Sequence, residues 1–301
     1  MSDHRVVTRE AAEEHIRRHY PHAQRIRFVD HGYDNVVAIV DDAHVFRFPR
    51  NTSGVKRLQF EAELLRHLAG KVTIAAIPRI AAVHAQPTYL ISPYISGTHL
   101  TNQAVQALPL EAQTALGRRL AEFMVQLNQV VEGSAVSQMR QHSGLDQADE
   151  SWAQFFERLF TRDPLPDERL RPFIAQCYPA WREQASREDA TYAIHDDLHI
   201  ANLLFKNTEL CGVLDFGDAN QGSIEEEMRV LYAMSHHVLQ AALSRYAELT
   251  GTQISAERVR LWAVTQELAS FIARLAKGET KHPTYLRGRY NLRQWLPTFP
   301  F

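Results

Sequence analysis

The stretch that most constrains this chain runs from residue 190 to residue 219 and reads ATYAIHDDLHIANLLFKNTELCGVLDFGDA. Two short apolar runs, 203–205 and 213–214, flank a polar turn, which is a pattern typical of a β-hairpin. Such a hairpin brings Asn202 and Asp215 together at its open end, and Asp197 lies just before the first strand. The sequence therefore predicts several polar, mostly acidic side chains at one place.

Crowded carboxylates repel one another unless a proton or a cation lies among them. Asn202 and Asp215 offer hard oxygen ligands of the kind that Mg²⁺ takes together with the phosphates of a nucleotide. Asp197 is then free to accept the proton of an alcohol that attacks a phosphoryl group. Turn-forming residues that meet by chance are the alternative, and five specified residues at two fixed spacings argue against it.

The pattern His195-x-Asp197-x-x-x-x-Asn202, followed thirteen residues on by Asp215-Phe216-Gly217, resembles the catalytic loop and metal-binding motif of the protein-kinase-like fold. The two motifs lie unusually close together, and no Ala-Pro-Glu segment follows them. In this compactness, and in the Asp that follows the second motif, the chain resembles the aminoglycoside phosphotransferase family. The resemblance implies an α+β, two-lobed protein-kinase-like fold. Its small β-rich nucleotide-binding lobe is expected over residues 1–94, and its larger, mainly helical catalytic and substrate-binding lobe over 95–301.

The resemblance also implies a role for each motif residue. Asp197 is expected to act as the catalytic base and His195 to support the loop that carries it. Asn202 and Asp215 are expected to bind Mg²⁺, with ATP or GTP as the phosphate donor. Asp196 stands where the family often has glycine, and its effect on Asp197 stays open.

Three β-type runs are expected near the N-terminus, at 26–29, 36–40 and 44–48. The resemblance places the loop that covers the nucleotide phosphates between the first two, with Gly32 and Asn35 as contacts. This segment holds a single glycine and the chain has no GxxxxGK[ST] motif. A hairpin turn without a ligand therefore accounts for these two residues equally well.

A helix is expected over 53–69, with Glu61 inside its apolar stripe. A buried carboxylate requires a partner, and strand alternation turns Arg47 away from Phe46 and Phe48 to a face where it can serve. The resemblance makes this the cation–glutamate pair that positions nucleotide phosphates, although the family usually has lysine in place of Arg47. A glutamate at the rim of a solvated face is the alternative.

Further strand is expected at Ile77-Pro78 and at 88–91, ending in Ser92-Pro93-Tyr94. This segment resembles the connection between lobes, where the nucleotide base meets main-chain groups near Ser92 and Tyr94. An ordinary strand-to-helix connection describes the same residues.

The rest of the chain is expected to be mainly helical. The periodicity predicts helices over 111–131, 152–159, 170–185, 224–249 and 255–276, with a polar loop over 133–144.

Composition excludes several functions. The net charge of −2 gives no general attraction to nucleic acid or to anionic membranes, and no apolar run reaches the length of a membrane span. The two cysteines, Cys177 and Cys211, lie far apart and suggest neither a disulfide framework nor a zinc site. A cytoplasmic protein that binds small molecules is expected.

The expected reaction moves the γ-phosphate of ATP or GTP to a hydroxyl of a small, cationic acceptor, which implies antibiotic resistance if that acceptor is an aminoglycoside. Asp218 and Glu226 are the candidate acceptor contacts, although acids also favour a helix N-terminus for structural reasons. A kinase of a macrolide, choline or homoserine is the alternative. A kinase-like binding protein without turnover is a third, and the intact Asp197, Asn202 and Asp215 argue against it.

Overall fold

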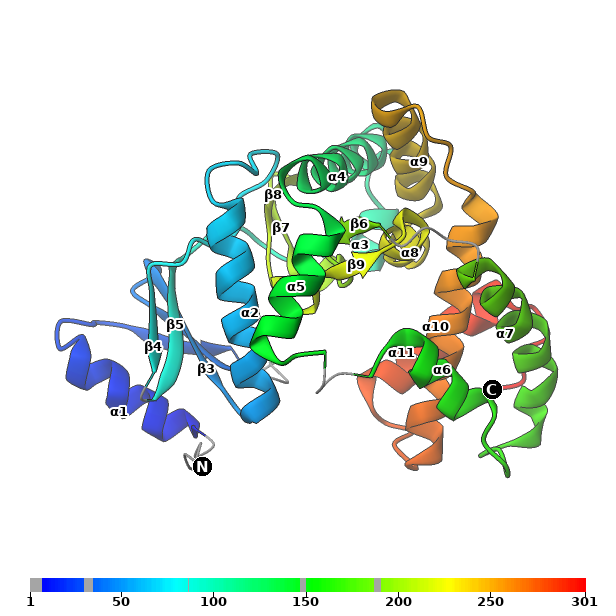
Figure 1. Cartoon of the computed structure of the whole chain (residues 1–301), viewed down its shortest axis with the longest axis horizontal. Helices are drawn as coiled ribbons and strands as arrows, with labels where there is room; N and C mark the ends of the chain where they lie inside the picture. The colour runs from blue at the N-terminus through cyan, green and yellow to red at the C-terminus, as the bar shows by residue number, and fades with distance from the viewer. Residues whose placement is uncertain (1–6, 30–34, 86, 147–149, 187–190) are drawn as a thin grey trace.

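The computed structural model describes residues 7–29, 35–85, 87–146, 150–186 and 191–301, and it divides into a sheet-containing part and a larger helical part (Figure 1). In the described residues the N-terminal sheet is antiparallel, with strand order β1-β2-β3-β5-β4. The strands are β1 (Ile26–Val29), β2 (Asn35–Val40), β3 (His44–Pro49), β4 (Ala82–Ala85) and β5 (Thr88–Pro93). This two-lobed α+β arrangement is the one that the sequence predicts.

Helix α1 (Arg9–His19) packs against the sheet, where its few apolar side chains are buried. The hydroxyl of Thr8 caps its first turn by accepting the N–H of Ala11. Ala12 and Ile16 are fully buried in the same cluster as Phe46 and Phe48 of β3.

Helix α2 (Thr52–Leu68) lies between the sheet and the helical part (Figure 1). The side chain of Asn51 caps it, and its leucines are buried on one face. Glu61 is fully buried on the same helix, so α2 carries a charge into the region where the two parts of the molecule meet.

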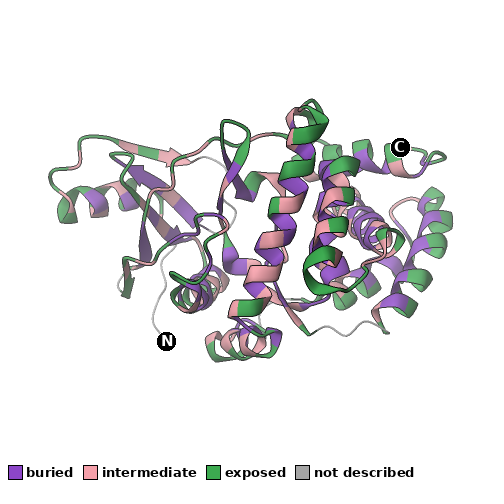
Figure 2. Ribbon diagram, turned by 90° about the horizontal axis from the view of Figure 1, so that it is seen from above, coloured by how far each residue is buried: buried purple, intermediate pink, exposed green. Residues whose placement is uncertain are grey.

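The helical part has two apolar clusters among the described residues, and Figure 2 shows buried positions on the inner faces of its helices. The first cluster includes α4, α5, α8 and α9, and the second includes the aromatic side chains of α6, α7, α10 and α11. The helices are α3 (Asn102–Gln106), α4 (Leu110–Val130), α5 (Gly133–Ser143), α6 (Trp152–Phe160), α7 (Arg171–Ala185), α8 (Ile224–Met234), α9 (His236–Thr250), α10 (Ala256–Ala276) and α11 (Pro283–Trp295).

Three predicted elements are wrong. The segment 133–144 is not a polar loop, because Val136 and Arg140 are buried on helix α5. The predicted helix 224–249 is two helices, since Ser235 is extended and its hydroxyl caps α9. The predicted strand at Ile77-Pro78 is irregular chain beside a single bridge at Ala76, and the strand that pairs with β5 is β4.

Candidate active site

The hairpin predicted around the turn at 206–208 is present as β7 (Leu203–Lys206) and β8 (Glu209–Val213). Its turn residues Asn207 and Thr208 have φ values of 51° and 69°. Positive φ values at both positions are typical of two-residue hairpin turns, whose backbone matches the right-handed twist of the flanking strands. At the open end, the N–H of Leu214 donates to the carbonyl of Asn202 at 2.8 Å. The hairpin therefore brings the two predicted motifs side by side.

Asn202 holds Asp197 in place. Its amide nitrogen Nδ2 donates to the main-chain carbonyl of Asp197 and to Oδ2 of the same residue, both at 2.9 Å. Burial raises the pKa of Asp197, His199 opposes this rise, and Asp215 adds to it. The result is an oriented carboxylate with an increased affinity for a proton.

His195 is fully buried beneath the loop that carries Asp197. Its Nε2 lies 2.9 Å from the carbonyl of Leu214, and its ring packs 4.6 Å from the ring of Phe216. Burial lowers the pKa of His195 to about 4, so the ring is neutral at pH 7. A neutral imidazole therefore links the two motifs, and the support that His195 gives to the loop stays a prediction.

Glu227 of α8 fixes the same loop from the other side, and sequence reasoning missed it. Its two carboxylate oxygens accept the N–H of His195 at 3.1 Å and the N–H of Asp196 at 2.9 Å. Burial raises its pKa to about 7, and this effect outweighs the two N–H donors, which favour the ionised form.

Asp196 is held in the left-handed region, with a φ of 62°. This conformation is unfavourable for a non-glycine residue, so contacts with neighbouring residues are needed to maintain it. Nη2 of Arg229 lies 2.7 Å from Oδ1 of Asp196 and donates to its carbonyl at 2.6 Å, and Nε1 of Trp152 donates to the carboxylate at 3.4 Å. Asp196 thus takes part in a buried ion pair, and its carboxylate is compensated beside Asp197.

Arg47 and Glu61 form the ion pair that the sequence predicts, with Nη1 and Oε1 2.6 Å apart. Nη2 of Arg47 also lies 3.2 Å from Oδ1 of Asp215, and Oε1 of Glu61 accepts the N–H of Phe216 at 3.2 Å. Burial raises the pKa of Glu61, with Arg47 opposing this rise. The pair therefore joins β3 and α2 to the second motif.

The residues at the open end of the hairpin fit a hard divalent cation. Because Nδ2 of Asn202 is committed to Asp197, its amide oxygen is left for another contact. Asp215 has a φ of 62° and uses one oxygen for Arg47. One carboxylate and one amide oxygen match the donor set that Mg²⁺ takes alongside phosphates. In the part of the chain that the structure describes, no group of three or more His, Cys, Asp or Glu could hold a metal ion.

The other predicted nucleotide contacts are placed unevenly. Gly32 lies outside the described residues. Asn35 is buried at the start of β2, and its Oδ1 has no hydrogen-bond partner among the residues described. Ser92 is buried on β5, and the N–H of Tyr94 donates to the carbonyl of Ala43 at 2.9 Å. That donor is therefore already used within the lobe.

A cavity of about 610 Å³ opens beside Asp197. Asp218 lines it and pairs with Arg57 of α2. Glu226, the second predicted acceptor contact, is absent from its lining among the described residues. The lining residues are Arg57, Arg140, Asp146, Glu150, Ser151, Trp152, Gln154, Asp196, Asp197, Asp218, Asn220 and Gln266.

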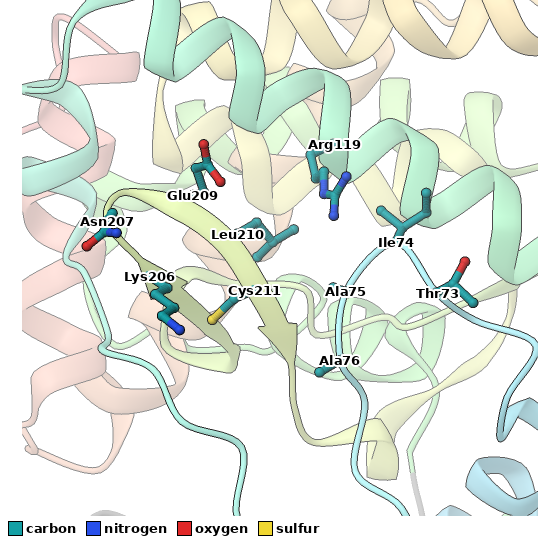
Figure 3. A pocket seen from close by; sticks show the side chains of 10 residues that line it. All are labelled: Thr73, Ile74, Ala75, Ala76, Arg119, Lys206, Asn207, Glu209, Leu210 and Cys211. Atoms are coloured by element: carbon teal, nitrogen blue, oxygen red, sulfur yellow. The ribbon is translucent and has the colours of Figure 1, made fainter.

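A second cavity of about 370 Å³ lies along the hairpin, between strand β8 and the chain that enters β4 (Figure 3). Arg119 of α4, Lys206 and Cys211 are among its lining side chains. It contains none of the residues that the sequence predicts for catalysis or binding. Of these two cavities, the larger one is thus the one lined by predicted site residues, Asp197 and Asp218.

A family model described as the phosphotransferase enzyme family matches residues 25–268, which include the hairpin, both motifs and the Arg47–Glu61 pair. The chain belongs to this family. No curated protein sequence matches this phosphotransferase significantly. Among the residues described, none of its helices is both long and apolar enough to cross a bilayer.

Solved structures share the fold of this phosphotransferase. The GDP and kanamycin complex of APH(2″)-IIIa is similar with a TM-score of 0.77 at 19% identity, over 96% of this chain and 99% of that one. The streptomycin–ATP ternary complex of APH(2″)-IIa has a TM-score of 0.69 at 19% identity, over 95% and 96% of the two chains. Macrolide 2′-phosphotransferase MphH from Brachybacterium faecium has a TM-score of 0.66 at 21% identity, over 97% and 99%.

Proposed function

We propose that this phosphotransferase moves the γ-phosphate of ATP or GTP to a hydroxyl of a small cationic molecule, with an aminoglycoside as the first candidate. The observation that carries the proposal is the position of Asp197, whose carboxylate is bound by Asn202 at 2.9 Å and lines the large cavity. A base in a cavity beside a cation site is what phosphoryl transfer to an alcohol needs.

Asp197 accepts the proton of the acceptor hydroxyl as that oxygen attacks the phosphoryl group. Its orientation comes from Asn202, and the loop that carries it is fixed by the hydrogen bonds of His195 and Glu227. Because burial raises its pKa, Asp197 is a stronger base than an exposed aspartate once it is ionised.

In this proposal Asn202 and Asp215 would hold a magnesium ion, which would supply charge stabilisation for the phosphates. Asp215 itself is held by Arg47 at 3.2 Å, so the ion pair with Glu61 positions one of the two ligands.

The nucleotide lies between the lobes, which we propose divide after Tyr94. Arg47 faces the phosphates, and Asn35 contacts them from the start of β2. Gly32 lies outside the described residues and stays a predicted contact. The main chain near Ser92 and Tyr94 meets the base. The unpartnered amide oxygen of buried Asn35 supports a polar ligand on this side of the sheet.

The acceptor occupies the large cavity, whose size suits a drug-sized ligand and whose walls hold Asp218 and Trp152. Complexes of fold neighbours with kanamycin and streptomycin support an aminoglycoside. A macrolide is the second candidate, because a macrolide phosphotransferase shares the fold over nearly the whole chain.

The test is a panel assay of the full chain with labelled ATP or GTP, magnesium and candidate acceptors. Aminoglycosides, macrolides and small amino alcohols are compared by phosphate incorporation into the acceptor. The proposal expects transfer to at least one aminoglycoside and none by Asp197→Asn. Transfer only to macrolides or amino alcohols would replace the aminoglycoside assignment, and no transfer to any alcohol would remove the phosphotransferase reaction itself.

A further inference from the structure

Five acids line the large cavity, and all of them except Asp197 are paired with arginines. Oδ1 of Asp146 lies 3.0 Å from Nε of Arg140. Oδ1 of Asp196 lies 2.7 Å from Nη2 of Arg229, and Oε2 of Glu150 lies 2.6 Å from Nη2 of Arg158. Asp218 pairs with Arg57. A cationic acceptor that needs one of these carboxylates therefore competes with a side chain of the protein.

The four pairs differ in how easily an acceptor can reach them. Arg229 and Arg140 are buried and make further hydrogen bonds to main-chain carbonyls, those of Asp196 and Ala219 respectively. Asp218 is more open, with 44% of its side chain exposed, and it directly follows the motif that begins at Asp215. Asp218 is thus the most exposed of the four paired acids, and it lies directly after the motif that begins at Asp215.

Arg57 reaches Asp218 because position 217 has no side chain. A Cβ atom placed on Gly217 would lie 2.8 Å from Cγ of Arg57, too close for both to stay. Gly217 has no left-handed φ, so the close approach of Arg57 is what favours glycine here. Arg57 is therefore packed over the second motif as well as paired with its last acid.

Arg57 stands one helical turn before Glu61 on α2. Glu61 binds the N–H of Phe216, and Arg57 binds the carboxylate of Asp218, so α2 contacts the second motif at two points. An acceptor that takes Asp218 from Arg57 would release one of these contacts and leave the other in place.

We infer that Arg57 determines acceptor specificity by occupying Asp218 until an ammonium group of the acceptor replaces it. The inference rests on the proposed function, since it gives Asp218 the role of an acceptor contact. Arg57 then sets a threshold: a polycationic acceptor displaces the guanidinium, and a neutral alcohol of the same size does not.

The test is calorimetric titration of the full chain with kanamycin and, separately, with a neutral trisaccharide of similar size. Arg57→Gln removes the competing cation, Asp218→Asn removes the contested carboxylate, and the double variant removes both. Arg66→Gln is the matched control, because Arg66 is an exposed arginine on the same helix and does not line the cavity. The dissociation constant for nucleotide, measured on each variant, reports whether the site remains folded.

Arg57→Gln is expected to bind kanamycin about 2- to 5-fold more tightly than the parent, as expected for losing one partly exposed ion-pair competitor. Asp218→Asn and the double variant are expected to bind it more weakly and equally, and salt should weaken the binding of Arg57→Gln most. Trisaccharide binding and Arg66→Gln should not change. Unchanged or weaker kanamycin binding by Arg57→Gln, with nucleotide binding intact, would overturn the inference.

Arg57→Lys gives a second reading if the glutamine variant does not fold. Lysine keeps the charge but loses the planar fork, so kanamycin binding should lie between those of the parent and Arg57→Gln. Weaker binding by Arg57→Lys than by the parent would count against the inference. Phosphate transfer is measured separately with the acceptor panel: if these affinity changes occur and no acceptor is phosphorylated, the proposed function fails and the competition at Asp218 stands.

Discussion

Nη1 of Arg47 lies 2.6 Å from Oε1 of Glu61, a carboxylate with no exposed surface. The same oxygen accepts the N–H of Phe216, so this one carboxylate joins a strand, a helix and the segment that begins at Asp215. Arg47 extends the link to Asp215 itself at 3.2 Å. Breaking the pair should therefore affect both the stability of the chain and the placement of the acid that we assign to magnesium.

Arg47→Ala should destabilise the chain by about 3 to 5 kcal/mol, because it leaves the buried charge of Glu61 without its partner. Arg47→Lys should cost less, since it keeps the charge and loses the second contact. Urea denaturation measures the free energy of unfolding, and nucleotide titration measures the dissociation constant, with Arg66→Ala as the surface control. If Arg47→Ala bound and used nucleotide like the parent, its role beside the phosphates would be wrong.

Asp215→Ala and Asp215→Asn should each reduce phosphate transfer by more than about 100-fold, because a metal ion supplies several kcal/mol of charge stabilisation. The two variants should differ in stability. The φ of Asp215 is 62°, a region that asparagine tolerates better than alanine does, so the asparagine variant should unfold at higher urea. Transfer is assayed with increasing magnesium, and parent-like turnover by Asp215→Ala at saturating metal would contradict the ligand assignment.

Asp218→Asn and Glu226→Gln should each raise the Michaelis constant for a cationic acceptor much more than that for nucleotide. Asp218 lines the cavity, so its substitution should have the larger effect, about 5-fold at low salt. Added salt should weaken acceptor binding in the parent enzyme. The measurement is a pair of steady-state titrations for each variant, and the cationic-acceptor assignment fails if neutral acceptors are preferred and both substitutions are silent.

The parts of the site that the sequence predicts are those fixed by local spacing. The hairpin is recognisable because its apolar runs and polar turn are contiguous, and its ends must then meet. The Arg47–Glu61 pair follows from a carboxylate inside an apolar helical stripe, where a partner is required. Both predictions depend only on short stretches of the sequence. The prediction of the pair also uses the rule that a buried charge needs a partner.

The hydrogen bonds that hold the loop carrying Asp197 could not be predicted from local spacing. Glu227 and Arg229 lie more than thirty residues after the main-chain groups of His195 and Asp196 that they bind. At the start of a helix, acids such as Glu227 look like residues that favour the helix dipole. Only the packing of α8 against the loop shows that this glutamate is buried and bonded.

The missed helix boundaries have a related cause. Helix α5 is polar along much of its length, so its few buried residues gave a weak periodic signal. At Ser235 the apolar periodicity continues on both sides of the break. A serine inside such a pattern can end one helix and cap the next, and the extended main chain at that residue depends on the tertiary structure.

Glu227 should give the chain a measurable dependence of stability on pH. Burial raises its pKa from 4.5 to about 7, so between these values the folded chain binds a proton that the unfolded chain releases. The contribution of Glu227 to the free energy of unfolding is therefore largest below pH 4.5, falls as pH rises to about 7, and is constant above that. The slope is at most about 1.4 kcal/mol per pH unit.

His195 acts in the opposite direction, because burial lowers its pKa from 6.5 to about 4. Over that range the unfolded chain binds the extra proton, so its contribution to stability rises with pH. The two slopes oppose each other between pH 4.5 and 6.5 in the parent chain. Glu227→Gln removes one of them and leaves the other, and the variant should therefore gain stability with pH over this range more steeply than the parent.

Urea denaturation of the parent and of Glu227→Gln at pH 5, 6, 7 and 8 measures this difference. Glu63→Gln is the control, because Glu63 is exposed on α2 and its replacement should leave the pH profile of the parent unchanged. The free energy of unfolding of the parent minus that of Glu227→Gln should fall from pH 5 to pH 7 and then level off. A difference that is flat or rises over this range would mean that Glu227 is ionised throughout, and that its two N–H donors outweigh burial.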